Sequence, residues 1–85
     1  MPKPSDIPHT VDLHGLSVQQ GYNKTLMLLK VAKMNAKKSC RIITGRSGTM
    51  NKEFQRWMEN PDFKPYIDKA WQDYHKGSWV VWVKQ

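Results

Sequence analysis

The order of apolar and polar residues predicts a strand and a helix in the first half of the chain. Polar and apolar positions alternate over residues 10–14, the period-2 pattern of a half-buried strand, and Gly15 ends that strand. Ser17 and Gln20 form a capping box, which predicts a helix from about residue 18 to residue 37. The spacing of its apolar residues places a core-facing stripe on this helix, made of Val18, Tyr22, Thr25, Leu29, Ala32 and Ala36 and flanked by Leu26 and Leu28.

The second half of the chain also alternates between strand and helix patterns. The predicted elements are a strand over residues 40–44, a helix over residues 50–59, and two strands over residues 67–74 and 79–83. Thr49 is expected to cap the second helix, and Asn60 ends it because a residue before proline is disfavoured in the helical region. The order βαβαββ predicts an α/β fold, a two-layer sandwich in which two helices pack on a mixed four-stranded sheet.

Length and composition bound the domain organisation. The 85 residues suffice for one small domain, which we place at residues 10–85, after an extended N-terminal lead-in over residues 1–9 that holds three of the five prolines. No stretch approaches the roughly 20 apolar residues that cross a bilayer, so no membrane segment is expected. Cys40 is the only cysteine, which excludes an internal disulfide and favours a reducing, cytoplasmic location. A monomer is expected.

The positive charge is concentrated in one part of the chain. Residues 1–52 carry nine Lys and Arg against two Asp, whereas residues 53–85 carry five residues of each sign, so the first part holds the whole net charge of +7. Lys30, Lys33 and Lys37 lie along one edge of the predicted helix stripe. This distribution is expected of a surface that meets a polyanion such as nucleic acid, and also of a solvated lysine face.

The Asp12-Leu13-His14-Gly15 segment is the first candidate for chemistry. Alternation along a strand would put Asp12 and His14 on one face of the sheet, about 7 Å apart, with Leu13 in the core. A histidine can exchange a proton near neutral pH, and a neighbouring carboxylate can orient it. The same residues also suit a structural histidine that is hydrogen-bonded at the edge of a sheet.

The second candidate is the glycine-rich segment between residues 44 and 49. Gly45 and Gly48 would let the backbone approach a ligand, amides at the start of the next helix would face an anion, and Arg46 would bind phosphate. The segment is not a P-loop, because the required Gly-Lys-Ser/Thr pattern is absent. A plain strand-to-helix turn is the alternative. If the two preceding strands are parallel neighbours, both candidate segments open on one edge of the sheet, and His14 and Arg46 share a rim.

These motifs resemble those of the Smr (small MutS-related) domain family, over roughly residues 10–84. The family is marked by Asp-Leu-His-Gly, here residues 12–15, and further along by Thr-Gly-x-Gly or His-Gly-x-Gly, matched here by Thr44-Gly45-Arg46-Ser47-Gly48. Two residues rather than one separate Gly45 and Gly48, and Thr44 stands where many nuclease members carry a second histidine.

The resemblance implies a fold similar to the C-terminal domain of translation initiation factor 3. It also implies nucleic-acid binding, with endonuclease activity in many members, some of which nick DNA while others cleave messenger RNA on stalled ribosomes. Carried over by position, Asp12 and His14 would be the catalytic residues. The nucleic-acid-binding residues would be Thr44, Gly45, Arg46, Ser47 and Gly48, to which the charge pattern adds Lys30, Lys33, Lys37 and Lys52.

The leading hypothesis is cleavage of RNA by acid–base chemistry of His14 and Asp12, without a dedicated metal or other cofactor. A two-metal site needs several carboxylates, and the basic segment offers only Asp6 and Asp12, roughly 20 Å apart if extended. One Asp with one His could still hold a single weak divalent ion. Three alternatives stay open: metal-assisted DNA nicking, a binding module without catalysis, and a protein-interaction domain that docks on ribosomes through Met27 and Met34, which lie opposite the core stripe.

Overall fold

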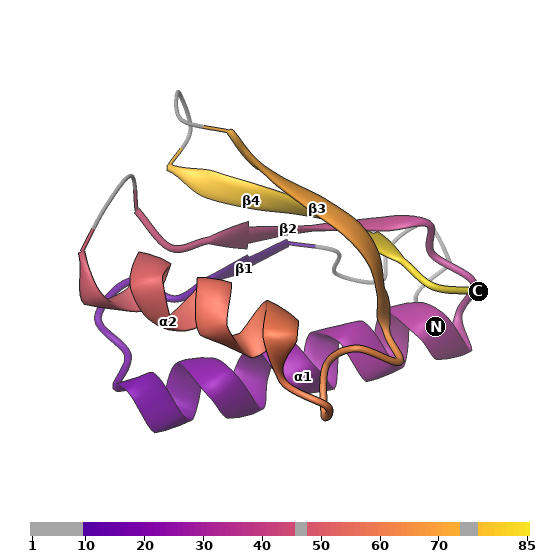
Figure 1. Cartoon of the computed structure of the whole chain (residues 1–85), viewed down its shortest axis with the longest axis horizontal. Coiled ribbons are helices and arrows are strands. Elements are labelled where there is room, and N and C mark those ends of the chain that lie inside the picture. Colours follow the sequence, from indigo (N-terminus) through magenta and orange to yellow (C-terminus); the bar gives the residue numbers. More distant parts are fainter. Residues whose placement is uncertain (1–9, 46–47, 74–76) are drawn as a thin grey trace, which may run out of the picture.

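The computed structural model describes residues 10–45, 48–73 and 77–85, and the predicted lead-in over residues 1–9 lies outside them. The described elements are β1 (Thr10–Asp12), α1 (Val18–Met34), β2 (Ser39–Ile43), α2 (Thr49–Glu59), β3 (Ile67–Asp73) and β4 (Ser78–Val83). Figure 1 shows α1 and α2 on one face of a twisted sheet, while no described helix covers the other face. The predicted βαβαββ order and the two-layer α/β fold are confirmed.

The four strands lie in the order β1-β2-β4-β3. β1 runs parallel to β2, whereas β4 is antiparallel to both of its neighbours, β2 and β3. α1 makes the crossover that two adjacent parallel strands require. The ladder continues one residue past β1, because the Leu13 N–H donates to the Ile43 carbonyl oxygen at 2.9 Å. The segments that follow β1 and β2 therefore leave the sheet at the same edge.

α1 begins where the capping box predicts and ends earlier than predicted. Ser17 and Gln20 exchange both hydrogen bonds of the box. The helix ends at Met34, because Ala36 adopts a left-handed conformation with φ of 55° and the Lys37 N–H bonds back into the last turn. Among the helices that the structure describes, none is both long enough and apolar enough to cross a membrane.

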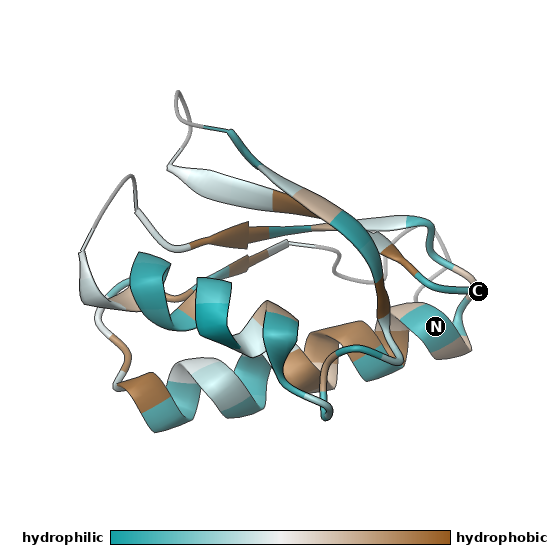
Figure 2. Ribbon diagram, in the orientation of Figure 1, coloured by the Kyte–Doolittle hydropathy of each residue, from teal (hydrophilic) through white to brown (hydrophobic). Residues whose placement is uncertain are grey.

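The core lies between the two helices and the sheet. Figure 2 shows hydrophobic residues gathered on the central strands and on the second half of α1. The buried side chains of α1 are the predicted Thr25, Leu29 and Ala32, together with Leu28. β2 and β4 alternate between buried and half-buried positions, as expected of strands with one face on a core.

The two ends of the predicted α1 stripe are not part of the core. Val18 lies in the first turn and is 39% exposed, and Ala36 lies beyond the end of the helix and is exposed. Met27 and Met34, predicted to lie opposite the stripe, are exposed by 62% and 83%. The helical phase of the stripe is therefore confirmed, and its predicted length is wrong.

Aromatic rings fill the space between α1, α2 and the segment that follows α2. The ring centroids of Tyr22, Trp57 and Phe63 lie 5.0–5.9 Å from one another. Trp57 and Trp79 are buried, as predicted for core tryptophans. Trp71 on β3 is 45% exposed, because it points away from the helices, so a core position is wrong for this residue.

Cys40 on β2 is expected to make the stability of the fold pH-dependent under alkaline conditions. Its side chain is buried, and burial raises the pKa of the thiol from 9.0 to about 11. The folded state therefore holds the thiol proton more tightly than the unfolded chain does. We expect this contribution to be fully present below pH 9 and to be lost as the pH rises toward 11, lowering the free energy of unfolding by about 1–3 kcal/mol.

Urea unfolding measured across this pH range checks the expectation, and the Cys40→Ala variant is the control because it has no thiol. The variant should lose less stability than the wild type between pH 9 and pH 11. Equal losses in the two proteins would show that the thiol is not the source.

Candidate nucleic-acid site

The Asp12-Leu13-His14-Gly15 segment forms a tight turn at the end of β1. The Leu16 N–H donates to the Leu13 carbonyl oxygen at 3.2 Å, and Gly15 has a φ of 76°, as the third residue of a type II turn requires. The Asp12 carboxylate accepts the backbone N–H of His14 at 2.9 Å. Leu13 is 1% exposed and anchors the turn in the core. The turn therefore presents His14 at an exposed corner.

This geometry differs from the predicted strand over residues 10–14. β1 ends at Asp12, so His14 lies in the turn rather than two positions along the same strand face. Leu13 keeps two features of a strand residue: its side chain is buried, and its N–H donates to β2. The hydrogen bond that the structure shows joins the Asp12 carboxylate to the main chain of His14. Asp12 thus holds the backbone that carries the imidazole.

The segment after β2 is held from two sides by polar contacts. The Gly77 carbonyl oxygen accepts the N–H groups of both Thr44 and Gly45, at 3.1 and 2.8 Å. The side-chain amide of Asn51 donates to the Gly45 carbonyl oxygen at 3.1 Å and to the Thr44 hydroxyl at 3.4 Å. Gln55 in turn donates to the Asn51 side-chain oxygen at 2.7 Å. The start of this loop is therefore fixed to both α2 and β4.

The sequence analysis did not single out Asn51 or Gly77 as site residues. Asn51 is 4% exposed, which is unusual for an asparagine and indicates that its side chain has a structural role. A usable signal was present, because Asn51 and Gln55 are spaced i, i+4 on the same side of α2 as Phe54, a buried residue. The contribution of Gly77 is a backbone carbonyl, which no residue pattern reveals.

α2 begins with a glycine cap rather than the predicted threonine cap. Gly48 is the N-cap residue, with φ of 100° and ψ of −172°, a region that only glycine adopts readily. Thr49 is the first helical residue, so its predicted capping role is wrong. Glycine has no side chain to cap the first amides of α2, and such amides form an anion-binding end. Arg46 and Ser47, predicted for the same loop, lie outside the described residues.

The two loops meet in one hollow at the edge of the sheet, as predicted from the parallel pairing of their strands. Its lining comes from both segments and consists of Leu13, His14, Gly15, Leu16, Val18, Thr44, Thr49 and Met50. His14 and the start of α2 are therefore brought together, while the share of Arg46 in this rim stays a prediction. A separate groove between α1 and β1 is almost entirely apolar and contains Lys24 as its one titratable lining residue.

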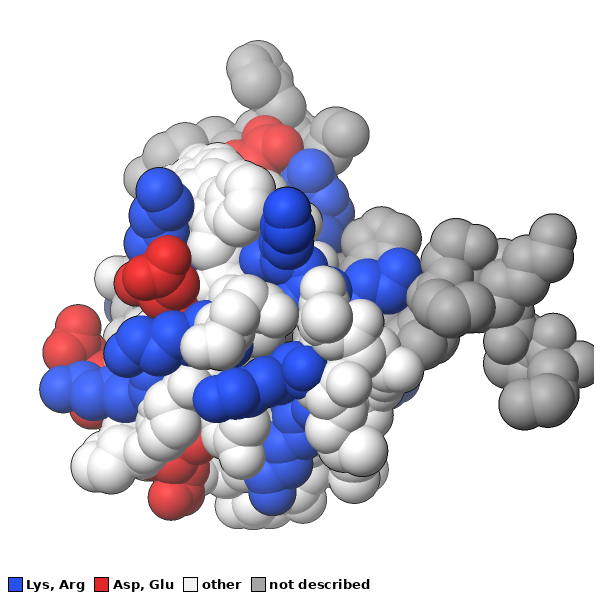
Figure 3. Space-filling model, turned by 90° about the vertical axis from the view of Figure 1, so that its right-hand side faces the viewer, with Lys and Arg blue, Asp and Glu red and all other residues white. Residues whose placement is uncertain are grey.

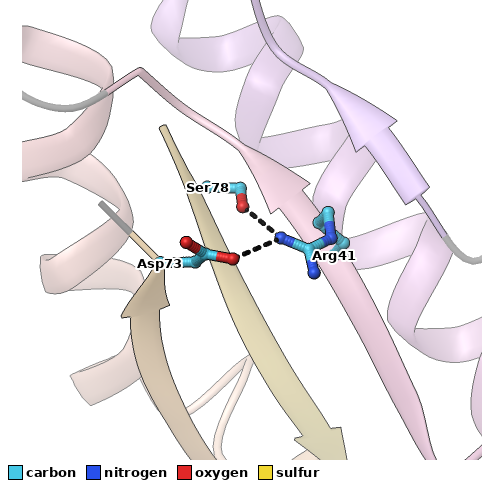
Figure 4. A network of polar contacts seen from close by, with 3 residues as sticks. All are labelled: Arg41, Asp73 and Ser78. Carbon is cyan, nitrogen blue, oxygen red and sulfur yellow. Dashed lines mark hydrogen bonds and ion pairs between the residues drawn. The ribbon is translucent and has the colours of Figure 1, made fainter. Parts of the chain in front are cut away.

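A three-residue polar network lies beside this loop (Figure 4). One guanidinium nitrogen of Arg41 donates to the Asp73 carboxylate at 3.2 Å and to the Ser78 hydroxyl at 2.7 Å. The contacts join β2, β3 and β4, and Ser78 follows directly on Gly77, whose carbonyl holds the loop. Arg41 is thus neutralised by Asp73 and supports the sheet end under the loop. Among the described residues, no group of three or more metal-ligating side chains lies close together.

The predicted lysine row does not lie at the hollow. α1 starts beside the hollow and runs away from it, so Lys33 is displaced from Val18 by about 22 Å along the helix axis. Lys33 donates to the Pro65 carbonyl oxygen at the far end of the molecule. Figure 3 shows Lys and Arg side chains gathered on this end. We call it the lysine end, and it comprises Lys30, Lys33, Lys37, Lys38, Lys64 and Lys84.

Backbone contacts bring the separate segments of the lysine end together. The Gln85 side chain donates to the Lys37 carbonyl oxygen, and the Lys84 N–H donates to the Tyr66 carbonyl oxygen. The site residues predicted from sequence therefore fall into two regions. The backbone of Lys52 lies in the first turn of α2, next to the loop after β2, but its side chain lines a separate groove with Gln55, Arg56 and Glu59. The lysine row lies at the opposite end.

The fold and the paired loops define the class of protein, a small α/β domain whose candidate site is built from the segments that follow two parallel neighbouring strands. The model of the Smr domain family matches residues 11–84. The chain therefore belongs to the Smr domain family, a family of nuclease and nucleic-acid-binding domains.

A solved structure shows the same fold. The chain is similar to the Smr domain of Thermus thermophilus MutS2, with a TM-score of 0.78 and 17% sequence identity. The match covers 89% of this chain and 98% of the other. No curated protein matches the chain.

Asn51 is expected to determine the stability of the loop after β2. Asn51→Ala removes one of two side-chain donors to the Gly45 carbonyl oxygen, the Thr44 hydroxyl being the other, so the free energy of unfolding should fall by about 0.5–1.5 kcal/mol. Chemical denaturation measures this loss. Gln55→Ala is the control, because it leaves both bonds from Asn51 to the loop in place and should cost less. An Asn51→Ala protein as stable as the wild type would contradict the assignment.

Proposed function

We propose that this chain is an endonuclease that cleaves RNA by the chemistry of His14 and Asp12, without a resident metal ion or other cofactor. The observation that carries the proposal is the shared hollow, in which the exposed His14 and the uncapped start of α2 lie side by side. A proton-accepting group and an anion-binding helix end are two of the parts that phosphodiester transfer needs.

The proposed reaction uses the ribose hydroxyl of the substrate as nucleophile. The imidazole of His14 takes the proton of a 2′-hydroxyl, and the freed oxygen attacks the adjacent phosphorus. The bond from phosphorus to the 5′ oxygen breaks, and that oxygen takes a proton from the imidazolium or from water. The products carry a 2′,3′-cyclic phosphate and a 5′-hydroxyl. Asp12 supports the step by holding the backbone of His14 in the turn.

Charge on the phosphate would be stabilised by the loop after β2 and the start of α2. Backbone amides at the N-terminus of α2 offer fixed donors to an oxyanion, and such donors are a major contribution to phosphoryl chemistry. Gly45 and Gly48 both have positive φ angles, and a Cβ atom at Gly48 would meet nothing within 4 Å, so a ligand can approach the backbone there. We propose that Arg46, Ser47 and Lys52 complete the phosphate contacts.

The lysine end extends the contact with nucleic acid away from the hollow. Exposed lysines neutralise phosphates without reading sequence, so this end would hold the backbone of a longer substrate. Lys30 and Lys33 line a groove beside Tyr66, and the Lys33 ammonium lies 5.6 Å from the centroid of that ring. The distance between the lysine end and the hollow predicts that short oligonucleotides engage only one of the two regions.

A binding module without catalysis is the second candidate. The observation that favours it is the position of Thr44, whose hydroxyl is hydrogen-bonded within the loop to Gly45 and Asn51. Thr44 stands where many nuclease members of the family carry a second histidine. Thr44 therefore offers no general acid at this position, and His14 would have to serve as both the base and the acid.

His14→Ala is expected to reduce RNA cleavage by at least about 100-fold, because general acid–base catalysis contributes about 10²–10⁴ in rate. Labelled single-stranded RNA, duplex RNA and supercoiled DNA are incubated with wild type and variant, with and without a chelator. Cleavage of RNA that persists in chelator and ends in cyclic phosphate is the expected result. His14 is exposed in a turn, so the variant should remain folded.

The other outcomes select the alternatives. Wild-type protein that binds but does not cleave would select the binding module. Cleavage of DNA that requires Mg²⁺ or Mn²⁺ would select metal-assisted nicking. RNA cleavage by His14→Ala at the wild-type rate would contradict the assigned chemistry.

The lysine end is expected to contribute to the salt dependence of binding. Changing both Lys30 and Lys37 to Gln should lower the slope of log affinity against log salt concentration by about 1.4 for single-stranded RNA, since each lost contact is worth about 0.7. Titrations of a long oligonucleotide at several salt concentrations measure the slope. Lys24→Gln is the control, because Lys24 lies in the groove beside Val11. An unchanged slope in the double variant would remove the lysine end from the interface.

A further inference from the structure

The sheet has one face that the helices do not cover, and two tryptophans lie on it. Ala70 and Val81 are paired neighbours on β3 and β4 that pack in the core. Since side chains alternate along a strand, the adjacent Trp71 and Trp82 point to the opposite face. Figure 1 shows this face of β3 and β4 turned away from α1 and α2.

The two indole rings form a compact aromatic surface. Their centroids lie 6.1 Å apart with an angle of 38° between the rings. Val80, the cross-strand partner of Trp71, completes the apolar area. The Lys69 ammonium lies 5.9 Å from the centroid of the Trp82 ring. Trp71 is 45% exposed, so its large flat side chain stands in solvent, whereas Trp82, which the Lys69 ammonium approaches, is half-buried.

The composition of this face favours nucleobases over a protein partner. The apolar cluster of Trp71, Val80 and Trp82 is small: the half-buried Ile43 of β2 is a further apolar residue on this face, and the charged pair of Arg41 and Asp73 lies directly beside the cluster. Protein interfaces of useful size bury far more apolar surface than these residues provide. A single-stranded nucleic acid, in contrast, needs aromatic faces for its bases and cations for its phosphates. Lys69 and the net charge of +7 supply the complementary charge.

The aromatic surface lies between the two regions already assigned to nucleic acid. β4 starts next to Gly77, which holds the loop of the hollow, and ends at Val83, whose N–H donates to the Lys38 carbonyl oxygen at the lysine end. Trp82 lies four residues along β4 from Ser78, about 13 Å at the rise of a strand. A strand of nucleic acid crossing this face would therefore connect the lysine end with the hollow.

We propose that Trp71 and Trp82 form a base-stacking subsite for single-stranded nucleic acid, placed between the lysine end and the hollow of His14. The inference deepens the proposed function, on which it rests, by naming single strands as the preferred substrate. Double-stranded nucleic acid has its bases stacked and paired inside the helix, so it cannot use an indole surface in this way.

The test compares Trp71→Ala with wild type in binding a fluorescently labelled poly-uridine oligonucleotide and a blunt RNA duplex of equal length. One lost base stack is worth about 1–3 kcal/mol, so the single strand should bind at least about fivefold more weakly. Duplex affinity and the salt slope should stay unchanged, because no phosphate contact is lost. Trp71→Phe, which keeps an aromatic face, should retain most of the affinity.

Met27→Ala is the matched control, since it removes an exposed apolar side chain from α1, in the groove beside β1 and away from the lysine end, and should leave both affinities unchanged. Trp71 lies on an edge strand and is exposed, and thermal unfolding verifies that its variants fold. The proposal is overturned if Trp71→Ala binds the single strand as wild type does. It is equally overturned if the variant weakens single strand and duplex alike, or if the wild type binds neither.

Separate measurements of binding and of cleavage distinguish a failure of this inference from a failure of the proposed function. Loss of cleavage in His14→Ala with unchanged binding by Trp71→Ala would retain the nuclease and reject the subsite. A single-strand defect in Trp71→Ala without any cleavage by the wild type would retain the subsite on a binding module.

Discussion

β1 and β2 lie next to each other in the same direction, with α1 crossing between them, and the candidate site depends on this pairing. Parallel neighbours end at the same edge of a sheet, so the turn after β1 and the loop after β2 meet there. The Leu13 N–H extends the pairing to the turn itself, and its side chain fixes the turn in the core. An antiparallel β1 would place His14 at the other end of the molecule, far from the start of α2.

Buried polar groups hold the loop at that edge. The Gly77 carbonyl oxygen and the Asn51 side chain bind the loop from opposite sides, while the contact of Arg41 with Ser78 supports the strand that carries Gly77. Buried polar atoms cost free energy unless they are paired, and each of these contacts pairs one. Gly48 is the N-cap residue of α2 and has no side chain, so it offers no side-chain cap to the first amides of this helix.

The charge of the molecule is divided between two regions. The hollow between the loops would engage one phosphate closely, whereas the lysine end offers dispersed charge about 20 Å away along α1. Trp71 and Trp82 occupy the uncovered face of the sheet between these regions. This arrangement suits an extended substrate, with chemistry confined to one end of the contact surface and affinity spread along it.

The local pattern of the sequence determined the elements and their order. Three short-range signals carried this information: the capping box of Ser17 and Gln20, the alternation in β1 and the apolar final strand. Each depends only on residues that are close together in the sequence. Tertiary structure decided what depends on distant contacts. It buried Asn51 against the loop after β2 and brought that loop next to the turn after β1, whereas the end of α1 at Met34 and the Gly48 cap are local features that the sequence pattern did not predict. It also separated the lysine row from His14, because the row lies toward the C-terminal end of α1, the hollow lies at its N-terminal end, and a helix of seventeen residues keeps these ends far apart.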